Sequence, residues 1–188
     1  GGALAAYAAR AGLEANIFLP RDVPLANRVE CQKLGAKVTL IDGLINDCGR
    51  LVAEKSKKEQ WFDLSTLKEP YRIEGKKTLG LELAEQLGWR VPDHAVVPSA
   101  SGAMFTKIWK GFNELACLGL LEGVEASSFG IDQNTAHHPD VKTRMHMTQA
   151  AGCSPIATAW ENGQNQVRPV RPNSIAKSLA IGNPADGI

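Results

Sequence analysis

Several features that would narrow the class of protein are missing from this sequence of 188 residues. Its four cysteines, at positions 31, 48, 117 and 153, form no C-x-x-C pair, so neither a zinc cluster nor a disulfide framework is indicated. The formal net charge of +1 gives no reason to expect a nucleic-acid or membrane-surface partner. No apolar run reaches the ~18 residues of a membrane span. Since no signal peptide is recognisable either, we expect a reduced, cytoplasmic protein.

What is present is ordinary for a globular protein, with 44% apolar and 22% charged residues and no internal repeat. Short apolar runs alternate with amphipathic patterns, which predicts an α/β fold of parallel-sheet lobes with flanking helices. Strands are predicted at Asn16–Pro20, Lys37–Ile41, His94–Pro98 and Arg144–Ala150. Helices are predicted over residues 3–10, 24–34, 44–58, 77–87, 105–118, 155–160 and 173–180.

Two segments interrupt this alternation. Residues 61–76 contain aromatics, a proline and a glycine without a regular period, and we interpret them as a long connection between lobes. Trp61 and Phe62 are then expected to pack between the lobes. Residues 123–140 are polar and predict a surface loop. We therefore expect a first lobe with its crossover over residues 1–75 and a second lobe over 76–188, with one compact unit as the alternative.

The stretch 92–121 is where we expect a binding site. It predicts a buried strand, a turn of small residues (Ser99–Ala103) and a helix with Phe105, Ile108, Phe112 and Leu115 on one stripe. A strand that leads through small residues into a helix N-terminus directs backbone N–H groups and the positive end of the helix dipole at one point. Such a turn favours an anion. An ordinary turn between strand and helix remains the alternative.

Other clusters of reactive residues are less informative. His137, His138, Asp140 and His146 lack the H-x-x-x-H spacing of a helical metal site, so we interpret them as a solvated loop and predict no metal. Cys153 precedes Ser154-Pro155, where Ser154 is the expected N-cap of the helix that follows. A small buried cysteine is the expected state there, and a reactive thiol is the alternative.

Four runs of residues together resemble one enzyme family. They are DLSTLKEPYRIEGKKTLGLELAEQLGW, FTKIWKGFNEL, AAGCSPIATAWENG and RPNSIAKSLAIGNPADG. All four are similar to threonine synthase, a family of fold-type II enzymes that use pyridoxal phosphate. The resemblance covers most of the chain apart from residues 123–140. It implies two α/β lobes like those of the tryptophan synthase β subunit, with the cofactor in the cleft between them.

The resemblance also implies an activity and a set of site residues. The reaction converts O-phosphohomoserine and water to threonine and phosphate, with pyridoxal phosphate as electron sink. The small-residue turn corresponds to the family's phosphate loop, so the cofactor-binding residues are Ser99, Ala100, Ser101, Gly102, Ala103 and Met104. The word Glu-Gly-Lys-Lys-Thr implies that Lys76, Lys77 and Thr78 line the substrate side, with a solvated helix start as the alternative.

The phosphate loop departs from the family pattern at two positions. The family loop resembles Pro-x-Gly-Ser-Gly-Gly, whereas this sequence has alanine at Ala100 and Ala103. A methyl group restricts positive φ and the close approach of backbone to phosphate. Ser101 still offers a hydroxyl, and the amides of Gly102, Ala103 and Met104 can still face an anion. We expect the double variant Ala100→Gly, Ala103→Gly to bind phosphate more tightly.

Three further parts that the family requires are not found in this sequence. It contains no Lys-Asp-Arg word, in which the family carries its Schiff-base lysine, and Gly1-Gly2 stand where a Ser/Thr/Asn-rich carboxylate loop is expected. The lobe that follows Asn183-Pro184 in the family is absent. We therefore name no catalytic residue and expect an internal piece that does not act alone on its phosphorylated amino-acid substrate. Two alternatives stay open. One is a non-catalytic core that packs stably, with a homodimer as one form, and binds at most an anion. The other is an enzyme like threonine dehydratase.

Overall fold

The computed structural model describes residues 1–65, 68–124 and 141–184. It divides into two compact units, Gly1–Ser65 and Thr66–Ile188, which we call the first and the second unit and describe separately. The division comes ten residues before the predicted boundary at residue 75. The reason is that Glu74, in the helix that ends at Gly75, forms ion pairs with Lys107 and Lys110 of the second unit.

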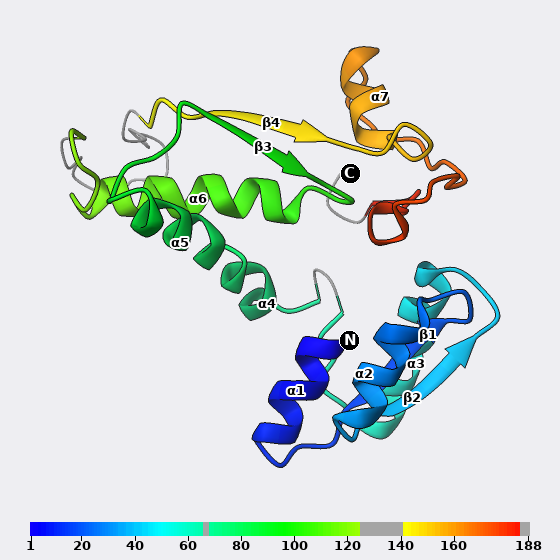
Figure 1. The fold of residues 1–188 in the computed structure, drawn as a ribbon. Helices are drawn as coiled ribbons and strands as arrows, with labels where there is room; N and C mark the ends of the chain where they lie inside the picture. Colours follow the sequence, from blue (N-terminus) through cyan, green and yellow to red (C-terminus); the bar gives the residue numbers. More distant parts are fainter. Residues whose placement is uncertain (66–67, 125–140, 185–188) are drawn as a thin grey trace. The chain divides into compact units, whose positions relative to one another are not determined.

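The first unit is a two-stranded parallel sheet with three helices (Figure 1). Asn16 pairs with Lys37 at one end of the sheet and Pro20 with Ile41 at the other. Small and apolar side chains from the helices pack on Ile17, so the core lies between sheet and helices. The elements are α1 (Gly2–Arg10), β1 (Asn16–Pro20), α2 (Leu25–Lys33), β2 (Lys37–Ile41) and α3 (Ile45–Glu59).

The structure describes the aromatic residues at the end of the first unit only within that unit, so their predicted packing between the lobes stays a prediction. The Trp61 ring lies 6.4 Å from the Phe18 ring of β1, measured between centroids, so its aromatic partner is in its own unit. Phe62 is 71% exposed. The left-handed conformation of Gln60 ends α3 and turns the chain so that Trp61 returns to the sheet.

The second unit is also a two-stranded parallel sheet, with α6 packed along it (Figure 1). His94 pairs with Arg144 and Pro98 with Thr148. The elements are α4 (Pro70–Gly75), α5 (Thr78–Gln86), β3 (His94–Pro98), α6 (Ala103–Cys117), β4 (Arg144–Thr148), α7 (Pro155–Glu161) and the 3₁₀ turn η1 (Lys177–Leu179).

Two glycines bring α5 and α6 into close contact. A Cβ added at Gly80 would lie 2.6 Å from the Ile108 carbonyl oxygen, and one added at Gly111 would lie 2.7 Å from the Lys77 carbonyl oxygen. Both helices therefore meet backbone to backbone, which positions α6 against α5 with little freedom. The predicted apolar stripe of α6 is confirmed, because Ile108, Phe112 and Leu115 are buried.

The predicted fold class is confirmed, and all four predicted strands are present in parallel pairs. One helix was not predicted, and one predicted helix is absent. The connection over residues 61–76 contains α4, because Glu69 accepts a hydrogen bond from the Arg72 amide and Pro70 opens the helix. Residues 173–180 form only η1, because the Ser174 hydroxyl accepts from the Ala176 amide and stabilises a turn.

Candidate functional site

The carboxyl ends of β3 and β4 meet at one edge of the second sheet. The Ser99 amide donates to the Thr148 carbonyl at 2.8 Å, so the residues that follow the two strands lie together. In parallel α/β sheets, ligands bind beyond the carboxyl ends of the strands. This edge, with the loop Ser99–Gly102 and the first turn of α6, is the candidate site.

The loop reaches α6 through a left-handed glycine. Gly102 has φ +95° and stands directly before the helix, where it offers no side chain to cap the first turn. No atom lies within 4 Å of the position that a Cβ would take, so the constraint at Gly102 is conformational rather than steric. The loop thus delivers the positive end of a 15-residue helix to the edge of the sheet.

The six predicted cofactor residues lie together but differ in what they offer. Ser99 is 3% exposed and its hydroxyl donates to the Val97 carbonyl, so its side chain stabilises the turn after β3. Ala103 is buried, and Met104 packs on the apolar cluster that contains Ile108 and Phe112. Ser101 and Gly102 are half-buried. These placements leave their binding role a prediction.

The prediction that Ala100 and Ala103 restrict a positive φ in the loop is wrong. Among the described residues, Gln60 and Trp89 alone combine a side chain with positive φ. Both alanines therefore adopt backbone conformations that any residue accepts, because Gly102 takes the left-handed turn. What remains of the expected effect is the bulk of the two methyl groups.

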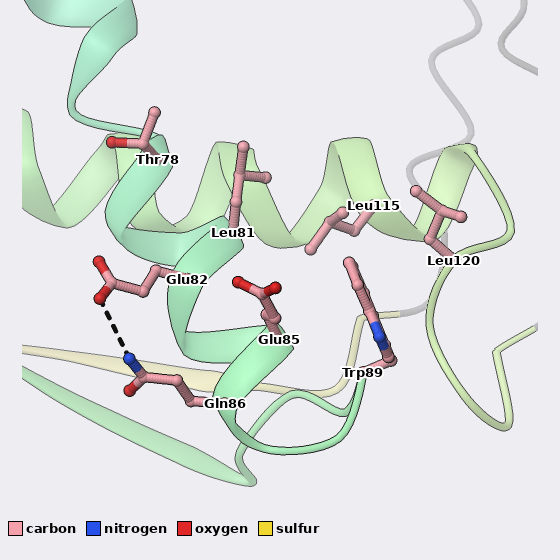
Figure 2. A pocket seen from close by; sticks show the side chains of 8 residues that line it. All are labelled: Thr78, Leu81, Glu82, Glu85, Gln86, Trp89, Leu115 and Leu120. Atoms are coloured by element: carbon pink, nitrogen blue, oxygen red, sulfur yellow. Dashed lines mark hydrogen bonds between the residues drawn. The ribbon is translucent and has the colours of Figure 1, made fainter.

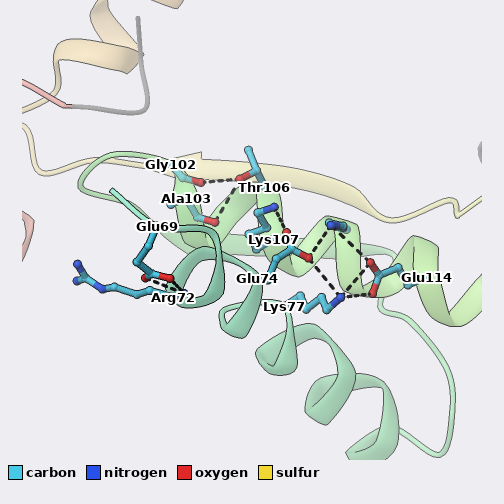
Figure 3. A network of polar contacts seen from close by, with 10 residues as sticks. Glu69, Arg72, Glu74, Lys77, Gly102, Ala103, Thr106, Lys107 and Glu114 are labelled. Atoms are coloured by element: carbon cyan, nitrogen blue, oxygen red, sulfur yellow. Dashed lines mark hydrogen bonds and ion pairs between the residues drawn. The ribbon is translucent and has the colours of Figure 1, made fainter. Parts of the chain in front are cut away.

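Five charged residues form a cluster beside α6 (Figure 3): Glu74, Lys77, Lys107, Lys110 and Glu114. The Lys110 ammonium lies 2.6 Å from the Glu74 carboxylate, and Lys107 pairs with the same carboxylate. Hydrogen bonds from Lys107 and then Lys110 lower the pKa of Glu74 to about 2. The Lys77 ammonium lies 2.9 Å from Glu114, which chiefly raises the pKa of Lys77. The cluster joins α4 and the start of α5 to α6.

The ion pairs of this cluster position Lys77, one of the three residues predicted to line the substrate side. Lys77 is at the level of Gly111 and Glu114, which are about 12 and about 16 Å along the axis of α6 from its first residue. The Thr78 hydroxyl donates to the Gly75 carbonyl at 2.7 Å. Within the second unit, Lys77 and Thr78 are therefore not brought to the phosphate loop. Lys76 lies beside them in the chain, and the substrate role of all three stays a prediction.

A groove of about 540 Å³ lies between α5 and the C-terminal half of α6 (Figure 2). Leu81 and Leu115 contribute apolar surface, while Glu82, Glu85 and Trp89 also line it. Leu115 is about 18 Å along α6 from the phosphate loop. Because two carboxylates and no cationic side chain line the groove, it is unsuited to a phosphate and is separate from the candidate site.

The histidine and cysteine candidates are only partly described. His137, His138 and Asp140 lie outside the described residues. The His146 ring nitrogen Nε2 lies 2.9 Å from His94 Nδ1 on the adjacent strand. In the described parts of the chain, no three potential ligands gather to hold a metal ion. Cys153 is buried, and burial raises the pKa of its thiol, which disfavours the reactive-thiol alternative.

Ser154 is the N-cap residue of α7, as predicted, but its side chain accepts no hydrogen bond from the first turn of the helix. Gln149 caps α7 instead, and its side chain also contacts the phosphate loop. The sequence argument missed Gln149 altogether. A signal was available, since Gln149 stands near the end of the predicted parallel strand Arg144–Ala150, and the carboxyl ends of parallel strands meet at one edge of a sheet.

Comparison with known proteins identifies the family. A sequence profile described as "Pyridoxal-phosphate dependent enzyme" matches residues 1–188. The chain belongs to this family of pyridoxal-phosphate-dependent enzymes. The family's cofactor is therefore pyridoxal phosphate, as the resemblance implied.

The chain is also similar to individual threonine synthases. It is 31% identical over 185 residues to the threonine synthase of Methanocaldococcus jannaschii, which covers 97% of this chain and 41% of the relative. It is 33% identical over 186 residues to that of Methanosarcina acetivorans, covering 98% of this chain and 41% of the relative. The chain thus spans about two fifths of these curated relatives, and the resemblance to threonine synthase is confirmed.

Similar solved structures confirm the fold. Maize serine racemase matches with a TM-score of 0.71 at 19% identity, over 95% of this chain and 46% of the racemase. Threonine deaminase isoform 2 of Solanum lycopersicum matches with a TM-score of 0.68 at 17% identity, over 95% of this chain and 44% of the deaminase.

Within the described residues, no helix is long and apolar enough to cross a membrane.

Proposed function

We propose that this chain provides the phosphate-binding part of a threonine-synthase-type enzyme, which converts O-phosphohomoserine and water to threonine and phosphate. The observation that carries the proposal is the passage from β3 through left-handed Gly102 into α6 at the carboxyl edge of the sheet. The relatives that are 31% and 33% identical are threonine synthases, which favours this reaction over others in the family.

The residues of the loop fit the phosphate group of the cofactor. The Ser101 hydroxyl and the amides of Gly102, Ala103 and Met104 would hold it at the N-terminus of α6, where the helix dipole favours an anion. The space open beside Gly102 leaves the backbone accessible there. When bound, pyridoxal phosphate supplies an electron sink for reactions at the α-carbon of an amino acid.

The chain's lysines do not supply the remaining chemistry. Lys107, one turn into α6, is paired with Glu74, and Lys77 is paired with Glu114. Neither ammonium is free to attack a cofactor carbonyl, and no lysine of the sequence stands in a Lys-Asp-Arg word. Groups that act as a unit lose most of the rate when one is missing. We therefore expect this chain by itself to bind phosphate without turning over the substrate.

The test compares pyridoxal phosphate with pyridoxal, which lacks the phosphate, by calorimetry. Tighter binding of pyridoxal phosphate supports the phosphate loop, and equal affinity would remove the basis of the proposal. Borohydride reduction followed by mass spectrometry then locates any attached lysine, and phosphate release from O-phosphohomoserine is measured in parallel. We expect diffuse labelling of surface lysines and no release. One stoichiometric lysine together with release would contradict the expected inactivity of this chain alone.

The purely structural form of the non-catalytic alternative makes a different prediction in the same experiment. A core that merely packs would bind pyridoxal phosphate and pyridoxal equally. The alternative of a threonine dehydratase receives less support, because the similar threonine deaminase and serine racemase structures are at most 19% identical and establish only the fold.

A further inference from the structure

One side chain connects the phosphate loop to a second helix. Gln149 follows β4, and its Nε2 donates to the Ala100 carbonyl at 3.2 Å. Its Oε1 accepts from the amides of Ile156 at 2.9 Å and Ala157 at 3.0 Å. The NH₂ group of this one side-chain amide therefore binds a carbonyl of the loop, and its oxygen binds two backbone N–H groups in the first turn of α7.

The local sequence explains why α7 depends on Gln149. Pro155 opens the helix and has no N–H, while Ser154 makes no capping bond to the backbone. The next two amides would otherwise lack a partner inside the helix. Because Gln149 comes from the end of β4, its capping bonds fix α7 to the edge of the sheet at which the loop lies.

We propose that Gln149 is a positioning residue for the phosphate loop, which rests on the proposed role of that loop in phosphate binding. In a trans peptide the carbonyl and the following N–H point in opposite directions. The bond from Gln149 to the Ala100 carbonyl thus sets the direction of the Ser101 N–H as well. It prevents a flip of this peptide, which would turn a carbonyl oxygen towards an incoming phosphate.

Two variants separate the contact with the loop from the capping of α7. Gln149→Glu keeps an acceptor for Ile156 and Ala157 but, when ionised, cannot donate to Ala100. Gln149→Met removes both contacts without adding a charge. Gln164→Glu adds the same charge at an exposed position after α7 and serves as the matched control.

The affinities for pyridoxal phosphate and for pyridoxal are measured for the four proteins at one ionic strength. We expect Gln149→Glu and Gln149→Met to weaken binding of pyridoxal phosphate about 3- to 10-fold, which corresponds to one hydrogen bond. Binding of pyridoxal and the behaviour of Gln164→Glu should stay unchanged. In amide NMR spectra, Gln149→Glu should move the Ser101 signal while Ile156 and Ala157 keep their protection from hydrogen exchange.

The outcomes distinguish this inference from the proposed function. If the unaltered chain prefers pyridoxal phosphate and both Gln149 variants keep that preference, Gln149 does not position the loop. The same conclusion follows if Gln149→Glu weakens binding while Gln149→Met does not, because charge repulsion then explains the loss. If the unaltered chain shows no preference, the phosphate loop itself has failed, and this inference fails with it.

Discussion

The chain builds the same passage from strand to helix twice, and the two passages differ in the side chains that surround the helix N-terminus. β1 ends at Pro20 and β3 at Pro98. Each strand is followed by a link of four residues, 21–24 in the first unit and 99–102 in the second, and then by a helix. The Arg21 amide donates to Ile41, the last residue of β2, just as the Ser99 amide donates to Thr148, the last residue of β4. The backbone therefore begins both links in the same way.

The side chains of the two links differ in kind. In the first unit, Arg21 pairs with Asp42, and the Asp42 carboxylate raises the pKa of Arg21 through a hydrogen bond. Pro24 stands directly before α2 and has no N–H. In the second unit the link consists of residues with small side chains, and Gly102 occupies the position equivalent to Pro24.

The residue after the second strand also differs between the units. Asp42 binds the side chain of its link, whereas Gln149 binds the backbone carbonyl of Ala100. The fold therefore supplies a helix N-terminus after the first strand of both units. The four link residues and the residue after the neighbouring strand then decide whether backbone amides are presented to a ligand.

The largest effect is expected where α6 is pressed against α5. Gly80→Ala places a methyl group 2.6 Å from the Ile108 carbonyl oxygen, so we expect a loss of about 1–3 kcal/mol in the stability of the second unit. Gly49→Ala in α3 is the matched control, because nothing lies within 4 Å of its added Cβ. Alanine there should stabilise the first unit by about 0.5–1 kcal/mol. Hydrogen exchange resolved along the chain measures both, and equal effects would contradict the packing argument.

A smaller effect is expected at the left-handed turn. Gly102→Ala must hold φ near +95° and should cost about 1–2 kcal/mol. It should weaken phosphate binding, because relaxation of the turn moves the first amides of α6. Pro24→Ala at the equivalent position of the first unit should leave phosphate binding unchanged. Calorimetry with inorganic phosphate tests the pair, and a Gly102→Ala variant with full affinity would show that the turn does not matter.

The charged cluster gives the second unit a predicted dependence on pH. The pKa of Glu74 is about 2, below its ordinary value of 4.5, so its stabilising effect is complete above pH 4.5. That stabilisation is lost as the pH falls from 4.5 towards 2. Glu74→Gln should remove this part of the loss, as measured by denaturant unfolding at several pH values.

Asp42→Asn provides the comparison in the first unit. Arg21 likewise lowers the pKa of Asp42, and the sign of the effect is therefore the same. Its effect should be smaller, because the Asp42 side chain is 77% exposed and has one cationic partner, whereas Glu74 is 35% exposed and has three. A larger pH effect from Asp42→Asn than from Glu74→Gln would contradict this ordering.

The smallest effect is expected from the double variant Ala100→Gly, Ala103→Gly. Neither alanine has positive φ, so the substitution relieves no backbone strain. Removing the methyl groups should still tighten phosphate binding slightly, while Ala103→Gly lowers the stability of the first turn of α6. A change in affinity above about tenfold would show that the methyl groups block the site.

The strands and the position of the loop were predictable from the sequence because both depend on local patterns. The apolar run His94–Pro98, the alternation of apolar and polar residues over Arg144–Ala150 and the small residues between β3 and α6 carry that information. The contacts of Gln149 and Glu74 depend on segments far apart in the chain. Glu74 meets Lys107 only after α4 packs on α6, and neither partner has a sequence pattern that selects the other.

The most direct test of the central claim is an amide NMR titration of the unaltered chain with inorganic phosphate and with pyridoxal phosphate. The account predicts that signals of Ser101, Gly102, Ala103 and Met104 move with both ligands. The amide signals at the equivalent place in the first unit, from Arg21, Asp22, Val23 and Leu25, should stay in place. Equal movement of the two links, or no movement at Gly102 and Met104, would show that the passage from β3 to α6 is not an anion site.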